Sequence, residues 1–193
     1  MDVGRFLLRA SIGGFFIGHG TQKLFGWFGG HGLAATGQFF EAVGLRPGRR
    51  QALTAGIAEA GGGILLAAGL ATPAAAAALT AVMLTAIRTI HFPKGPWVSE
   101  GGYEYNVVLI ASVLALTDLG PGEWSLDAAL GLERRGAKWM LGALAAGAAG
   151  SAIATAKRTP QPDPLESNST RGTSVPTADA PNAAARPQTT GES

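Results

Sequence analysis

Hydrophobic and polar positions divide the chain into long apolar segments separated by short polar ones. The longest apolar segment spans residues 52–87 and contains a single charged residue, Glu59. One bilayer crossing needs about 20 apolar residues, so this segment is long enough for two. Pro73 lies near its middle, and proline ends a helix and disfavours helix in the residue before it. The pattern therefore predicts a hairpin of two membrane-spanning helices, over about 52–70 and 74–91.

Three further apolar segments predict helices on either side of this hairpin. The first covers about residues 5–25, and another covers about residues 105–119. The last, residues 139–156, is uncharged but rich in alanine and glycine, and alanine favours insertion less than leucine or isoleucine does. It could cross the membrane or lie at its surface. The expected fold class is all-α, a membrane-embedded four-helix bundle with a possible fifth transmembrane or interfacial helix.

The loop over residues 26–51 contains a second, shorter helical pattern. Its apolar positions recur at helical spacing at Leu33, Phe39, Phe40 and Val43. We expect a short amphipathic helix on the membrane surface, closed by Gly44 and Pro47.

The last part of the chain differs in composition from the rest. From residue 157 onward it consists largely of proline, serine, threonine and alanine, with almost no large apolar residues. Such a segment cannot bury enough surface to offset the entropy of ordering. The predicted organisation is a four-helix domain over 1–127, a connecting segment with the possible fifth helix over 128–156, and a disordered tail over 157–193.

Composition supports a membrane protein and excludes several kinds of chemistry. Hydrophobic residues make up 47% of the chain and charged residues 15%, against about 25% charged in an ordinary soluble domain. The net charge of +2 is too small and scattered for nucleic-acid binding. Without cysteine, disulfides, thiol catalysis and cysteine-held metal clusters are excluded. No self-sufficient catalytic motif is present, so a redox role would require a cofactor, a quinone or a partner's thiol, and enzymatic activity stays undecided.

Polar residues collect on one side of the predicted membrane domain. Because successive helices alternate in direction, the end of the first helix, the start of the second, the end of the third and the start of the fourth share one face. The candidate ligand-binding cluster there comprises His19, Gln22, Lys23, Glu59, Arg88, His91, Tyr103, Glu104 and Tyr105. At a rise of 1.5 Å per residue, His19 and Glu59 would each lie about 10 Å inside that face.

Glu59 is the residue of this cluster that is hardest to place in lipid. A charged group within the bilayer costs about 2.5–3.5 kcal/mol, so Glu59 either pairs with a cation or keeps its proton. We expect it within reach of His19, Lys23 or Arg88. A structural role stays open, because lysine and arginine can extend to the interface and a histidine such as His91 can anchor there.

Two features of the first helix bear on packing. Arg5, Arg9, His19 and Lys23 fall in a narrow stripe that should point inward. Gly14 and Gly18 form a pair of small residues four apart, which lets helices approach closely in lipid. We expect that pair to pack inside the bundle rather than between two copies of the chain.

The histidines also raise the question of a metal or haem. His19 and His91 lie on different helices near one face, but each has a nearer polar partner and histidines that ligate a haem in a helix bundle usually lie deeper. Haem is therefore disfavoured, as is a metal site built from His19, Glu59 and His91.

Several of these motifs together resemble the DoxX family of small bacterial integral membrane proteins. Residues 19–30, HGTQKLFGWFGG, resemble the signature of its first helix, and residues 33–44 resemble its next segment. Glu59 followed by three glycines is similar to its second-helix motif, and the segments 91–95 and 101–105 resemble its third-loop motifs. The motifs occur in the family's order over about residues 5–127.

The resemblance implies a multi-pass protein of the bacterial plasma membrane, with a function in redox chemistry or oxidative stress. Distant relatives include the small subunit of a thiosulfate:quinone oxidoreductase. One reading is a redox-associated subunit that binds a quinone-like ligand beside His19, Gln22, Lys23 and Glu59. The alternative is a non-enzymatic membrane scaffold that recruits soluble redox partners, and transport is a third, lesser reading.

Overall fold

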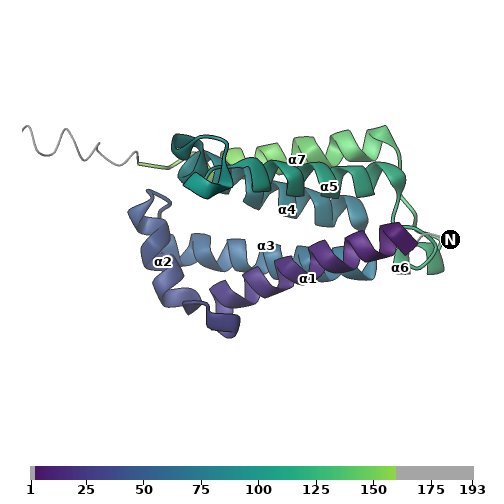
Figure 1. The fold of residues 1–193 in the computed structure, drawn as a ribbon, viewed down its shortest axis with the longest axis horizontal. Helices are drawn as coiled ribbons and strands as arrows, with labels where there is room; N and C mark the ends of the chain where they lie inside the picture. The colour runs from purple at the N-terminus through teal and green to yellow at the C-terminus, as the bar shows by residue number, and fades with distance from the viewer. Residues whose placement is uncertain (1–2, 160–193) are drawn as a thin grey trace, which may run out of the picture. The chain divides into compact units, whose positions relative to one another are not determined.

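The computed structural model describes residues 3–159, which form helices joined by short turns with no β-strand among them (Figure 1). The long helices are α1 (Val3–Phe25), α3 (Gly48–Ala68), α4 (Thr72–Ala86), α5 (Glu104–Leu119) and α7 (Ala137–Thr155). The shorter elements are η1 (Trp27–Gly29), α2 (Gly32–Ala42), η2 (Ile87–His91), η3 (Phe92–Lys94), η4 (Val98–Glu100) and α6 (Leu126–Ala129). The predicted all-α fold is confirmed, and the predicted tail lies outside the described residues from residue 160 onward.

The long helices form two layers. In one layer α1 packs along α3, and in the other α4 packs against both α5 and α7 (Figure 1). The layers meet where α3 contacts α4. The core between them is made by fully buried side chains, among them Leu66 on α3, Leu79 on α4 and Leu116 on α5. α4 is thus the central helix, and the layers are held together by its contacts.

The α1–α3 layer depends on glycine. A Cβ atom added to Gly13 would lie 2.6 Å from the carbonyl oxygen of Gly63, so the two backbones touch. Gly20, two turns further along α1, makes a similar close approach to Ala60 on the same interface. Gly14 and Gly18, by contrast, have nothing within 4 Å, so the expectation that they pack inside the bundle is wrong. Each residue turns an α-helix by about 100°, which places these two glycines off the face that carries Gly13 and Gly20.

The predicted hairpin is present as α3 and α4. α3 ends at Gly69, whose φ of 66° is the left-handed conformation that glycine adopts without strain. Pro73 lies in the first turn of α4, where its missing N–H costs no helical hydrogen bond. The free N–H groups of this turn are capped from elsewhere in the chain, because the Asp127 carboxylate accepts from the backbone nitrogens of Ala71 and Thr72 over 2.9 and 3.2 Å.

The fifth predicted helix belongs to the bundle. α7 packs on α4 and α5 over its length rather than lying away from them (Figure 1). Within the described residues, three helices are long and apolar enough to cross a membrane: Gly48–Ala68, Thr72–Lys94 and Ala137–Thr155. α7 is therefore a candidate transmembrane helix, and its packing does not match the interfacial alternative.

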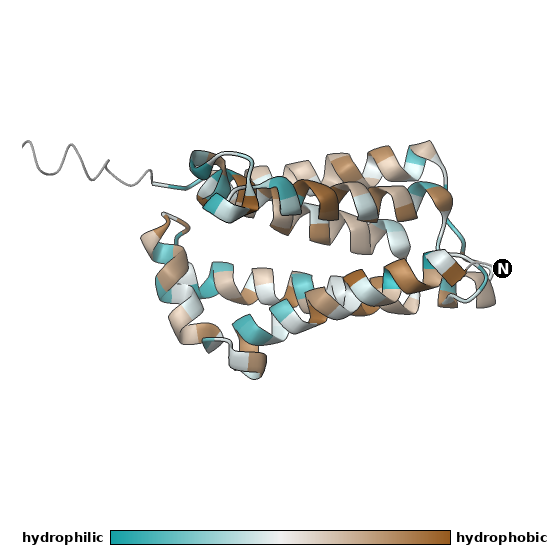
Figure 2. Ribbon diagram, in the orientation of Figure 1, coloured by the Kyte–Doolittle hydropathy of each residue, from teal (hydrophilic) through white to brown (hydrophobic). Residues whose placement is uncertain are grey.

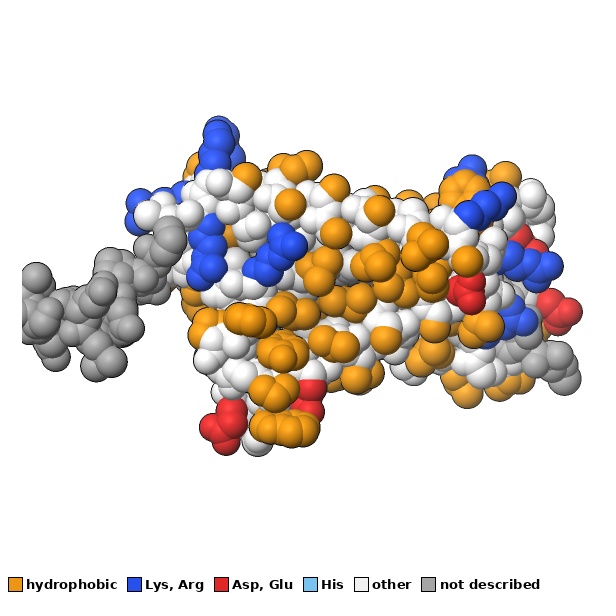
Figure 3. Space-filling model, turned by 90° about the horizontal axis from the view of Figure 1, so that it is seen from above, with side chains coloured by type: hydrophobic (Ala, Val, Ile, Leu, Met, Phe, Trp, Pro, Cys, Tyr) orange, Lys and Arg blue, Asp and Glu red, His pale blue; other side chains and the backbone are white. Residues whose placement is uncertain are grey.

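The outer surface is that of a membrane protein. Hydrophobic residues cover the long helices along most of their length, and hydrophilic ones concentrate towards the helix ends (Figure 2). On the face drawn in Figure 3, charged side chains gather towards the two ends and hydrophobic side chains lie between them. Large exposed apolar side chains include Phe15 on α1, Ile57 on α3 and Ile153 on α7. Contact with lipid accounts for this exposure, because a soluble bundle would bury these side chains.

The short helix predicted in the first loop is α2, which packs against α3 and α1. It lies across the end of α3 instead of running along it (Figure 1). Gly37, its buried residue, packs against the backbone of Arg49 at the start of α3. A Cβ atom added to Gly37 would lie only 3.0 Å from Cα of Arg49. α2 therefore closes one end of the α1–α3 layer and stands over the space between the two layers.

Candidate functional site

A cavity of about 820 Å³ lies between the two layers at the end closed by α2. Its walls come from α1, α2, α3, α4 and α5, with further residues from α7 and the loop before α5. Most of these walls are apolar. Phe16 on α1, Phe39 and Phe40 on α2, Val82 on α4 and Leu109 on α5 contribute to them.

Most of the predicted site residues line this cavity: His19, Gln22, Lys23, Glu59, His91 and Tyr105. They come from helices that are distant in sequence, and the alternation of helix direction brings them to one end of the bundle. The structure therefore groups these residues around one space, as their depth along the helices predicts.

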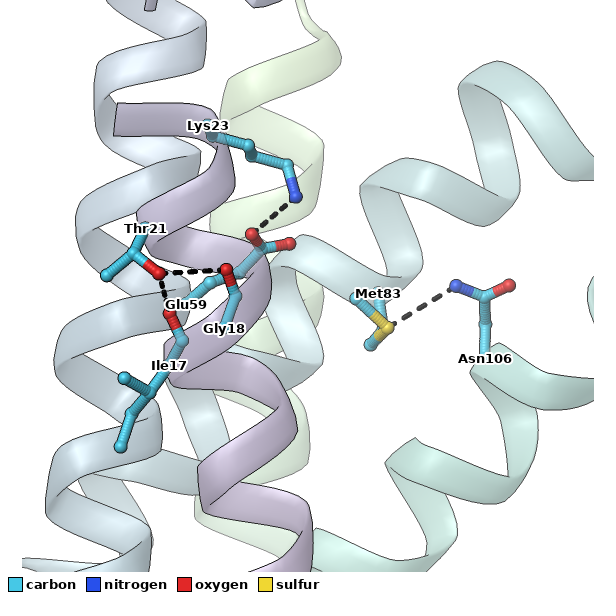
Figure 4. Close-up of polar contacts among 7 residues, drawn as sticks. All are labelled: Ile17, Gly18, Thr21, Lys23, Glu59, Met83 and Asn106. Carbon is cyan, nitrogen blue, oxygen red and sulfur yellow. Dashed lines mark hydrogen bonds and ion pairs between the residues drawn. The ribbon is translucent and has the colours of Figure 1, made fainter. Parts of the chain in front are cut away.

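The strongest polar contact in the cavity joins Lys23 on α1 to Glu59 on α3. The ammonium donates to Oε2 over 2.5 Å (Figure 4). Side-chain exposure is 3% for Glu59 and 24% for Lys23. The expected cationic partner of Glu59 is thus Lys23. The second carboxylate oxygen, Oε1, has no hydrogen-bond partner among residues 3–159.

The close packing of α1 on α3 positions this ion pair. Gly20 is one turn before Lys23, and a Cβ atom there would lie 2.4 Å from the backbone nitrogen of Ala60. Because Ala60 follows Glu59 directly, the backbones that carry the two charged groups are held together by this contact. Larger residues at Gly20 would move Lys23 away from the carboxylate.

His19 and Gln22 are placed differently from Lys23. His19 is exposed at the cavity wall and makes no hydrogen bond within the described part of the chain. The Gln22 amide donates to the carbonyl of Phe28 over 3.2 Å and so holds the turn after α1. Of the two, His19 has the imidazole free for a ligand.

His91 lies at the end of a π-helical turn. The segment Ile87–His91 continues α4 in this wider form, which is frequent at functional sites. The imidazole Nδ1 donates to the carbonyl of Gly101 over 2.7 Å, which leaves Nε2 as an acceptor. Thr89, within the same turn, is buried and donates to the carbonyl of Thr85 over 2.8 Å.

Arg88, Tyr103 and Glu104, also predicted in the cluster, are not among the residues that line the cavity. Arg88 is exposed because it lies one position before Thr89, which faces inward. The Tyr103 ring stacks on Phe92 with 6.0 Å between centroids. A carboxylate oxygen of Glu104 accepts from the backbone nitrogen of Val98 over 2.7 Å. The last two residues therefore shape the loop between η2 and α5.

Asn106 is a cavity residue that sequence reasoning missed. It is 7% exposed on α5, and its amide Nδ2 donates to Sδ of Met83 on α4 over 3.3 Å (Figure 4). In the sequence it was only the first residue of an apolar run. A lone amide at the start of such a run is the available signal, because asparagine is costly in lipid unless it is partnered.

Arg9 lies at the opposite end of the bundle and has no part in the cavity. It is fully buried, and its guanidinium donates to the carbonyls of Trp124 and Ala67 over 2.6 and 3.4 Å. Its Nε has no partner among the described residues. The inward direction predicted for Arg9 from the α1 stripe is therefore correct, and its role is to join α1 to the turns at that end.

Arg158 is a second residue that sequence reasoning missed, since it falls in the segment assigned to the tail. Its guanidinium donates to the carbonyls of Val43, Arg88 and Thr89 over 3.2, 3.1 and 3.4 Å. These contacts tie the segment that follows α7 to the end of α2 and to the π-helical turn. Arg158 thus closes the bundle beside the cavity.

No group of three or more histidine, aspartate or glutamate side chains among the described residues is placed to hold a metal ion. The chemistry available in the cavity is hydrogen bonding and proton exchange by an ion pair, an amide and imidazoles.

Comparison with known proteins identifies the first part of the chain. Residues 4–92 match the model of the DoxX family, which confirms the resemblance over α1 to η2. No curated protein and no solved structure matches the chain. The ion pair lies within the matched residues, whereas Asn106, α5, α7 and Arg158 lie beyond them.

Proposed function

We propose that this membrane protein, whose residues 4–92 are a DoxX domain, binds a quinone-like ligand in the cavity between its layers. The observation that carries the proposal is the Lys23–Glu59 ion pair, which is largely buried and borders a mostly apolar cavity. A volume of about 820 Å³ falls within the range of about 300–1,000 Å³ typical of small-molecule sites.

The ion pair has donors and acceptors for both redox forms of such a ligand. An ammonium carries three N–H donors, so Lys23 can bind a quinone carbonyl while it keeps its bond to Glu59. A quinol hydroxyl is a donor, and Oε1 of Glu59 is open to accept from it. Glu59 can also take up or release the proton that accompanies the change between the two forms.

The apolar walls suit the rest of the ligand. Phe16, Phe39 and Leu109 surround the space with side chains that make favourable contacts with a ring or an alkyl chain. Fatty acids and free phenols have an apolar body like that of a quinone, but they differ from a quinone in having a single polar end.

In this function the protein is a redox-associated component of a bacterial plasma membrane. The chain has no cysteine, so electrons for the quinone would come from a partner protein rather than from thiols of its own. Quinone-linked electron transfer is one route by which such a protein would act in oxidative stress.

A scaffold is the second candidate, supported by one surface feature. Phe25, Trp27 and Phe28 at the turn after α1 are 63%, 57% and 74% exposed. Aromatic rings at such a turn either sit among lipid headgroups or bind another protein. Replacing Trp27 and Phe28 by serine should abolish co-purification of a soluble redox protein if the scaffold role is correct.

The binding proposal is tested with protein in lipid nanodiscs and a benzoquinone that carries a decyl chain. Wild-type protein should bind it saturably and unfold at a higher temperature when it is present. Glu59→Gln and Lys23→Met should each weaken binding at least 10-fold. Glu133→Gln is the matched control, since Glu133 is exposed and lies outside the cavity. Equal binding by wild type and both cavity variants would refute the proposal.

A further inference from the structure

Asn106 has an unusual environment for a buried amide. Its single hydrogen bond within the described residues goes to the sulfur of Met83, and a thioether is a weak acceptor. A side-chain amide can make four hydrogen bonds, and buried polar groups normally have strong partners. Leaving such a group underused is costly, so its presence calls for an explanation beyond packing.

The position of Asn106 supplies that explanation. It lines the same cavity as the ion pair but comes from the other layer, on α5. In Figure 4, the Glu59 carboxylate and the Asn106 amide lie on different walls, with Met83 on the helix between them. Both layers therefore contribute polar groups to a mostly apolar cavity, the ion pair from the α1–α3 layer and the Asn106 amide from the other.

We propose that Asn106 is a ligand-binding residue that holds a second oxygen atom of the molecule whose first oxygen meets Lys23 and Glu59. This inference rests on the proposed function and narrows its ligand to a flat ring with oxygen atoms on opposite sides. A molecule with one polar end, such as a fatty acid or a phenol, would leave the amide without its partner.

The amide suits both redox forms of a ring of this class. Its NH₂ group donates to a carbonyl oxygen, and its Oδ1 accepts from a hydroxyl. Rotation of the amide by half a turn exchanges the two. The weak hydrogen bond to Met83 orients the amide while the cavity is empty. Breaking it costs little, so the amide is available when a ligand is bound.

The test is a comparison of two ligands on three proteins in nanodiscs. The ligands are an alkyl-1,4-naphthoquinone and the corresponding alkylchromone, a flat monocarbonyl analogue in which a ring oxygen that accepts hydrogen bonds poorly replaces one of the two carbonyl groups. The proteins are wild type, Asn106→Leu and the control Ser112→Ala, whose hydroxyl bonds to the Val108 carbonyl in its own helix and lies outside the cavity.

Wild type and Ser112→Ala should bind the dicarbonyl compound about 10-fold more tightly than the monocarbonyl one, as expected for one additional hydrogen bond. In Asn106→Leu this preference should vanish, because the dicarbonyl compound loses about 10-fold and the monocarbonyl compound less than 2-fold. Equal weakening of both ligands, or of neither, overturns the assignment of Asn106 while leaving the proposed function standing. Failure of wild type to bind either ligand overturns both.

A second measurement does not depend on the variant being folded. Infrared spectra of wild-type protein with a quinone labelled with ¹³C at one carbonyl or the other should show both carbonyl bands lowered in frequency by hydrogen bonding. A second carbonyl with the frequency of the free molecule would contradict the proposal.

Discussion

The guanidinium of Arg9 donates to the backbone carbonyl of Trp124 over 2.6 Å, which fastens the first helix to the turn that precedes α6. A second bond from the same group reaches Ala67 near the end of α3. At this end of the bundle the turns are therefore joined by a buried cation. At the other end α2 and the loop before α5 stand over a cavity, and this difference places the candidate site at one end only.

Arg9→Met should destabilise the protein although it leaves the cavity unchanged. The variant removes a fully buried guanidinium and leaves the carbonyls of Trp124 and Ala67 without their donor. A buried polar group that loses its partner costs about 1–3 kcal/mol. The free energy of unfolding in detergent should fall by that amount, and ligand affinity should stay the same. Arg134→Met, at an exposed position, is the control.

The two halves of the cavity ion pair should differ in their tolerance to replacement. Lys23→Met leaves Glu59, which is 3% exposed, without its cation, whereas Glu59→Leu leaves Lys23, which is 24% exposed and can turn towards water. The first change should cost more, about 3 kcal/mol for an unpaired buried charge. The double variant should recover most of this loss, because it leaves neither charge behind. Unfolding measured near neutral pH gives the three values, and equal costs for the single variants would contradict the asymmetry.

Alanine substitutions at two glycines of α1 should distinguish a close contact between helices from an open surface. Gly13→Ala places a methyl group 2.6 Å from the carbonyl of Gly63, so α1 and α3 must move apart, at a cost of about 1–3 kcal/mol. Gly14→Ala, one residue further, meets nothing within 4 Å and should be neutral or slightly stabilising because alanine favours helix. Thermal unfolding of the two variants side by side checks this. Similar losses in both variants would contradict the assignment of Gly13 to a close helix contact and of Gly14 to open surface.

Arg158 should mark where the structural part of the C-terminal segment ends. Arg158→Ala removes the donor to three backbone carbonyls and should lower the free energy of unfolding by about 1 kcal/mol. Lys157→Ala, at an exposed neighbouring position, should have no effect. Removal of residues 160–193 should also leave stability unchanged, as their composition predicts. Protease resistance and thermal unfolding of these proteins would show whether the boundary lies there.

The sequence by itself determined the long helices, the hairpin and the level along the helices at which the polar residues lie. The hydropathy of a segment can be read from consecutive residues, because a membrane crossing needs a set length of apolar chain. The direction of each helix follows from the one before it, because each turn reverses the chain. For that reason Lys23 and Glu59 could be expected at one level, and the pairing of Glu59 with a cation followed from the cost of an isolated charge in lipid. The DoxX motifs added a family resemblance, which the match over residues 4–92 supports for that part of the chain.

Only the tertiary structure decided which polar side chains meet. The rotation of each helix about its axis is set by contacts with distant residues, such as Gly13 against Gly63. The π-helical turn places Thr89 inward and leaves Arg88 exposed, which the α-helical pattern did not predict. Asn106 pairs with Met83 only because α5 packs on α4. These arrangements depend on side-chain packing between helices. The spacing of hydrophobic and polar residues along the sequence does not specify that packing.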